Sequence, residues 1–152
     1  MTTAFIDGAA TFAPLTAPLR DWLRENAEIA AAVDTDTNGT VQVYAGGVPD
    51  AASGTSISIY TAGGLDGGAL HDRPFARFNV WADSAAEAEQ VAYTLRSVLE
   101  HAAGAALGPA ADPSDVRLVG ADTAAPLWAP DPDTNTPRFV VTSTLTVQAV
   151  GI

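Results

Sequence analysis

The residues of this chain that could bind a cation are concentrated in the stretch DTDTNGT, residues 34–40. Asp34, Asp36 and Asn38 stand at the first, third and fifth positions of an EF-hand calcium loop, and Gly39 stands at the sixth. The twelfth position, which needs a bidentate glutamate, is Ala45, and residues 41–45 alternate like a strand rather than an exiting helix. We therefore interpret the stretch as a polar turn, with a calcium-binding or small-ligand module as an alternative.

Residues that could carry catalysis are few. The chain has no cysteine and only two histidines, so it has no thiolate nucleophile and little material for a metal hydrolase. His71 and Asp72 are adjacent in sequence, which is unusual for a catalytic pair, and no serine stands in a nucleophile-elbow motif. We expect no enzyme and no cofactor; a hydrolase that uses two carboxylates is the weakest alternative.

Composition restricts the possible partners. The 152 residues are 47% apolar, which predicts one domain over residues 1–152 with a substantial core. The chain has seven basic residues, all arginine, and 18 acidic residues. Its formal net charge of −11 disfavours binding to nucleic-acid phosphates. No apolar run is long enough to cross a membrane, and the N-terminal stretch lacks the basic and apolar regions of a signal peptide.

Periodicity predicts the elements. A helix is expected from Thr16, as N-cap, to Asn26, which caps a second short helical turn that buries Ile29 and Val33. The main helix is expected to begin after Ser84, which forms a capping box with Glu87, and to end by Gly104. Alternation predicts strands over 41–45, 56–61, 75–82 and 138–150, with a less certain one over 116–121.

These elements predict an α+β fold: a mostly antiparallel four- to five-stranded sheet with two to three helices packed on one face. Two segments rich in glycine or proline, residues 61–74 and 125–137, are expected to be surface loops.

The sheet face opposite the helices has an unusual predicted composition. It comprises Gln42, Tyr44, Ser58, Tyr60, Phe75, Arg77, Asn79, Trp81, Thr142, Thr144, Thr146 and Gln148. One charged residue among twelve, with several aromatic ones, is typical of an interface core. Tyr93 is the large aromatic residue on the polar side of the main helix. The interface candidates are Tyr44, Tyr60, Phe75, Arg77, Trp81 and Tyr93; a Pro-rich loop of the same chain folded over the sheet is the alternative.

Several stretches occur in an order that resembles a known family. They are LRDWLRENAEIAAAV (19–33), VQVYAGGVPD (41–50), TSISIY (55–60), FARFNVWADSAAEAEQVAYTLRSVL (75–99) and RFVVTSTLTV (138–147). In this order the chain resembles the tail terminator, or tail-completion, proteins of long-tailed bacteriophages, over roughly residues 15–150. The long loop at 61–74 and the Pro-rich segment depart from the family's pattern.

The resemblance implies a structural virion protein of the tail or neck, assembled in the host cytoplasm. Such proteins form a ring, commonly of six, that caps the tail tube, ends its elongation and joins it to the head-tail connector. Candidate contacts with these partners are Leu65, Asp66, Leu70, His71 and Arg73 of the Gly-rich loop. DNA would pass through an acidic lumen without binding. Another neck or tail-tube component, such as a head-completion protein, is the alternative within this class.

Overall fold

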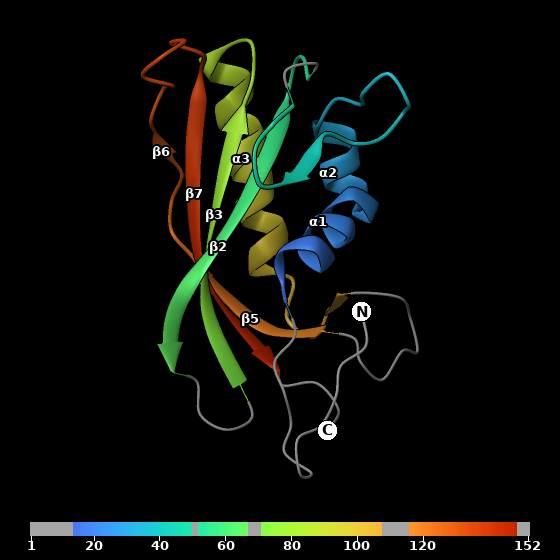
Figure 1. The fold of residues 1–152 in the computed structure, drawn as a ribbon, viewed down its shortest axis with the longest axis vertical. Helices are drawn as coiled ribbons and strands as arrows, with labels where there is room; N and C mark the ends of the chain where they lie inside the picture. The colour runs from blue at the N-terminus through green and yellow to red at the C-terminus, as the bar shows by residue number, and fades with distance from the viewer. Residues whose placement is uncertain (1–13, 50–51, 67–70, 108–115, 149–152) are drawn as a thin grey trace.

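A computed structural model describes residues 14–49, 52–66, 71–107 and 116–148. Its sheet has the strand order β1-β2-β3-β7-β5-β4, with β6 paired to β7 beyond the end of β5 (Figure 1). The strands of this described part are β1 (Val43–Ala45), β2 (Ser56–Asp66), β3 (His71–Trp81), β4 (Ala106–Leu107), β5 (Val116–Thr123), β6 (Leu127–Trp128) and β7 (Arg138–Gln148). The three longest strands, β2, β3 and β7, lie side by side and form the centre of the sheet.

The helices in the described residues are α1 (Thr16–Glu25), α2 (Ala27–Ala32) and α3 (Ala85–Glu100). Asn26 separates α1 from α2 and caps α2 as predicted, because its side chain accepts hydrogen bonds from the backbone N–H groups of Glu28 and Ile29. The Ser84 hydroxyl accepts the N–H of Glu87 and starts α3, as the capping-box prediction required. None of the described helices is long and apolar enough to span a membrane.

The N-terminal boundary of α1 differs from the prediction. Leu15, not Thr16, is the N-cap residue, and no side chain caps this helix. The Thr16 hydroxyl instead pairs with the hydroxyl of Thr61 on β2, at 2.6 Å. Leu15 is buried, so its apolar packing and the Thr16–Thr61 bond fix the helix start in place of a cap.

One hydrophobic core lies between the sheet and the helices. The buried stripe of α3 recurs at helical spacing: Ala88, Val91, Ala92, Leu95, Val98 and Leu99. It packs on β3, β5 and β7, while α1 packs on β1 and β2. Phe78, Val80 and Val141 present the inner face of the sheet to these helices and are buried. Alternation along each strand therefore assigns one face to the core and leaves the other for solvent or partners.

The fold is α+β, as predicted, but the sheet differs in two respects. It has seven strands in the described residues rather than four or five, and it is mixed, because β1 pairs with β2 in parallel. The additional strands β4 and β6 have two residues each, too few to produce an alternating pattern. β1 begins at Val43 rather than Val41. The side chain of Gln42, just before it, is buried and donates hydrogen bonds to the carbonyl oxygens of Ser53 and Thr55.

The Gly-rich segment after residue 60 is mostly strand rather than loop. β2 continues to Asp66 and β3 begins at His71, so the two form a hairpin that extends past the helices (Figure 1). A bulge between Ala62 and Gly64 shifts the register, and Gly64 pairs with Pro74. A Cβ atom on Gly64 would overlap the carbonyl oxygen of Arg73, so glycine permits this close approach. Low strand propensity concealed the pairing in the sequence.

Candidate functional site

The outer face of the sheet, defined as the face opposite the helices, carries most of the predicted interface residues. Strand register places them in cross-strand rows. Tyr60, Arg77 and Thr142 form one row, and Ala62, Phe75, Thr144 and Asp122 form the next. Tyr60 and Phe75 are 46% and 44% exposed. Large aromatic side chains on a face that the described chain leaves open are typical of a surface that binds another protein.

Arg77 is held in place by two hydrogen bonds in series. Its Nε donates to Oδ1 of Asn79 at 3.2 Å, and the Asn79 amide donates to the hydroxyl of Ser58 at 3.3 Å. Asn79 and Ser58 are both buried. In the described part of the chain, no acidic side chain forms an ion pair with Arg77. The guanidinium is thus oriented by its neighbours while its charge is left for an external acceptor.

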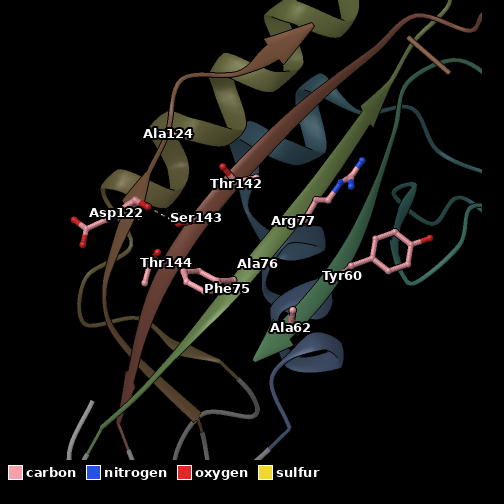
Figure 2. Close-up of a pocket in the computed structure, with 10 residues that line it drawn as sticks. All are labelled: Tyr60, Ala62, Phe75, Ala76, Arg77, Asp122, Ala124, Thr142, Ser143 and Thr144. Carbon is pink, nitrogen blue, oxygen red and sulfur yellow. Dashed lines mark hydrogen bonds between the residues drawn. The ribbon is translucent and has the colours of Figure 1, made fainter. Parts of the chain in front are cut away.

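A hollow of about 450 Å³ lies along the middle and lower part of the outer face. Its lining residues are Tyr60, Ala62, Phe75, Ala76, Arg77, Asp122, Ala124, Thr142, Ser143 and Thr144. Figure 2 shows Tyr60 and Arg77 on one side of it, Asp122 on the other, and Phe75 and Thr144 between them. The buried Ser143 hydroxyl pairs with that of Thr123 at 2.9 Å and donates to the Asp122 carbonyl oxygen. The hollow is therefore a shallow, mainly apolar recess with the cation of Arg77 on one side and the carboxylate of Asp122 on the other.

The end of the outer face around Trp81 is covered by another segment of the same chain. The Arg138 guanidinium lies 5.0 Å from the centroid of the Trp81 ring, and its Nε donates to the carbonyl oxygen of Ala129. Ala129 follows β6 in the Pro-rich segment, so this segment fixes Arg138 over Trp81. The chain therefore covers the face itself at Trp81, whereas Tyr60, Phe75 and Arg77 remain exposed and their role in an interface stays a prediction.

Tyr44 does not belong to the open surface. It is half-buried, with the Arg24 guanidinium 5.9 Å from its ring centroid. Burial raises the pKa of Tyr44, and the nearby Asp36 carboxylate raises it further. Burial also lowers the pKa of Arg24, assisted by repulsion from Arg20. These contacts bind Tyr44 to the N-terminal helix.

Tyr93 lies on the other side of the molecule. It is two residues from both Val91 and Leu95, which face the sheet, and two helical residues differ by about 200° in direction. Its side chain is 46% exposed. The structure therefore does not bring Tyr93 together with Phe75 and Arg77, and any common role requires two different surfaces.

The predicted partner-contact residues lie at the end of the β2–β3 hairpin. Leu65 and Asp66 end β2, His71 and Arg73 are in β3, and Leu70 lies outside the described residues. His71 and Asp72 are neighbours in one strand, so their side chains point to opposite faces and cannot act as a pair. The hairpin end remains a proposed contact site.

The cation candidates act as turn residues. Oδ1 of Asp36 accepts the N–H groups of Asn38 and Thr40, and Oδ2 of Asp34 accepts the N–H of Thr55. Asn38 is exposed. Within the described ranges, no group of three His, Asp or Glu side chains is arranged to hold a metal ion. These hydrogen bonds account for the sequence DTDTNGT as a polar turn attached to the start of β2.

The Pro-rich segment, expected to fold over the sheet through Trp128, leaves two large apolar side chains exposed. Leu127 and Trp128 of β6 are 65% and 47% exposed, and Trp128 packs its ring against Phe139 at 5.3 Å. Asp122 and Ala124 also line the hollow without having been predicted. A two-residue strand between prolines gives no periodic signal, so only the structure reveals these positions.

Comparison with solved structures identifies a similar fold. A chain of the virion of a native gene transfer agent particle superposes with a TM-score of 0.61 and 24% sequence identity. The match covers 89% of this chain and 95% of the other. No protein-family model and no curated protein sequence matches this chain. The comparison therefore establishes a shared fold over nearly the full length of both chains.

Proposed function

We propose that this chain is a non-enzymatic structural protein of a phage-like virion that assembles through surfaces of its fold. The observation that carries the proposal is the fold similarity to a virion chain of matching length. The open, charge-poor outer face with exposed Tyr60 and Phe75 supports it independently, because such a face is typical of protein interfaces.

Within the virion, we propose the role of a tail terminator. In this role, copies of the chain form a ring, commonly of six, that caps the tail tube and joins it to the head-tail connector. The support is the order of stretches that resembles tail terminator proteins. The β2–β3 hairpin, which extends beyond the helices, is the proposed contact to the tube or connector (Figure 1).

A different neck or tail-tube component, such as a head-completion protein, is the second candidate. The similar structure comes from a whole virion, and its description names no position within the particle. Both candidates are assembly proteins, and they differ in the partner that the ring contacts.

Electron microscopy and mass measurement test this function. The purified chain is examined alone and mixed with the tail-tube protein of the same particle. Rings in the micrographs, and tubes that stop growing when the chain is added, are expected for a terminator. Rings that bind no tube would favour another neck component. A chain that stays monomeric at every concentration, with and without tube protein, would overturn the proposal.

A further inference from the structure

We infer that one copy of this chain binds a second copy front to back. The outer sheet face around Arg77 of one copy receives the exposed side of α3, around Tyr93, of the next copy. The inference rests on the proposed function and extends it, because it names the two surfaces that meet and the chemistry that joins them.

The receiving surface combines one arginine with two exposed aromatic residues. Arg77 is oriented by Asn79 and has no acidic partner in the part of the chain that the structure describes. Tyr60 and Phe75 flank it beside the hollow (Figure 2). Arginine and tyrosine are the residue types that most often dominate binding energy in protein interfaces. The hollow therefore fits a partner that offers a large side chain together with a carboxylate.

The exposed side of α3 offers both groups. Glu89 precedes Tyr93 by four residues and Glu100 follows it by seven, so all three side chains project from the same side of the helix. Each of these three residues is exposed, and Arg96 is the basic residue between them. The side of α3 that faces away from the sheet thus combines a tyrosine with a net negative charge.

Charge distinguishes this pairing from the face-to-face alternative. The helices carry six acidic residues, Asp21, Glu25, Glu28, Glu87, Glu89 and Glu100, against three basic ones, Arg20, Arg24 and Arg96. The outer sheet face carries Arg77 and Arg138, with Asp122 at the rim of the hollow. A second outer face offers Arg77 the Asp122 carboxylate together with further arginines, whereas the helix surface offers it Glu89 and Glu100.

The positions of the two surfaces make the contact repeat. They lie on opposite sides of a two-layer molecule, so a copy that is bound on one side still offers the other surface. Such a heterologous contact continues from copy to copy, and it closes into a ring when each step includes a suitable rotation. A ring is the assembly that the proposed function requires.

A mixing experiment with two interface variants tests the inference. Arg77→Glu disables the outer face, and Tyr93→Ala removes the aromatic side chain from the helix surface while alanine retains helix propensity. Each variant alone is expected to weaken self-association at least about tenfold. Mixed together, they retain one intact contact, so native mass spectrometry should detect a one-to-one dimer and nothing larger. Thr37→Glu, in the exposed polar turn, is the control and should assemble like the wild type.

The outcomes separate this inference from the proposed function. If the wild type assembles and Tyr93→Ala assembles equally well, the front-to-back contact is wrong and the structural role stands. If the variants fold, by circular dichroism, and give no mixed dimer, the contact is also wrong. A wild type that never associates overturns both.

Discussion

At the residue scale, the structure divides the predicted interface candidates into three environments. Phe75 and Arg77 are open to a partner, Trp81 lies beneath Arg138, and Tyr44 is engaged by Arg24. Alternation predicted the face for Phe75, Arg77 and Trp81 correctly. It could not predict which of them the chain itself covers, since the covering residues Ala129 and Arg138 are distant in sequence from residue 81.

Replacing Trp81 with alanine separates internal packing from a role in assembly. Trp81→Ala should lower the free energy of unfolding by about 2–3 kcal/mol, because the half-buried ring and its cation–π contact with Arg138 are lost. Phe75→Ala, at an exposed position in the same strand, should cost less than about 1 kcal/mol. Urea denaturation measures both, and equal losses would mean that Arg138 does not protect Trp81.

Asp131 should contribute a pH-dependent part of the stability. Backbone N–H groups of Asp133 and Thr134 donate to its carboxylate and lower its pKa below the ordinary value of 3.8. A lowered folded-state pKa means that the stabilisation is present above the unfolded-state pKa and is lost as pH falls through the folded-state pKa. Asp131→Ala should therefore unfold more easily than wild type at neutral pH, and the difference should shrink in acid. A difference in unfolding free energy between wild type and variant that stays constant from neutral to strongly acid pH would contradict this prediction.

At the element scale, long periodic segments were predictable, whereas the two-residue strands were not. The buried stripe of α3 and the alternation of β7 follow directly from the sequence, because many residues repeat one pattern. β4 and β6 depend on pairing with long neighbours. Alternation predicted a strand at β1, but not its parallel pairing with β2. The Gly-rich arms of the hairpin have unfavourable strand propensity. They form strands because β2 and β3 pair with each other there.

The bulge in the β2–β3 hairpin provides a test of that pairing. Gly64→Ala should destabilise the hairpin or shift its register, because the added methyl group meets the Arg73 backbone, which cannot move independently of the strand. Gly63→Ala is the matched control, since a Cβ atom there contacts nothing and should be nearly neutral. Hydrogen exchange of the β2 and β3 amides reports the difference. Equal protection in the two variants would exclude the close approach at Gly64.

At the scale of the whole molecule, the acidic balance affects any nucleic acid that passes nearby. A net charge of −11 offers few cations to replace the counterions of DNA, so binding gains no entropy from counterion release. Fluorescence anisotropy should show no binding of the chain to duplex DNA even at about 50 mM salt. We propose that this charge lets DNA pass through an assembled ring. Binding that weakens steeply with added salt would show a basic patch and would contradict the idea.

The arrangement of the three long central strands also has a mechanical consequence. β2, β3 and β7 are eleven residues each and run antiparallel beside one another. A force along the strands loads many of their hydrogen bonds at once, whereas a force across them separates the bonds one after another. Since each bond contributes only about 1 kcal/mol, this difference in direction determines the resistance to rupture. The protein should therefore be stiff along its long axis and weaker across it.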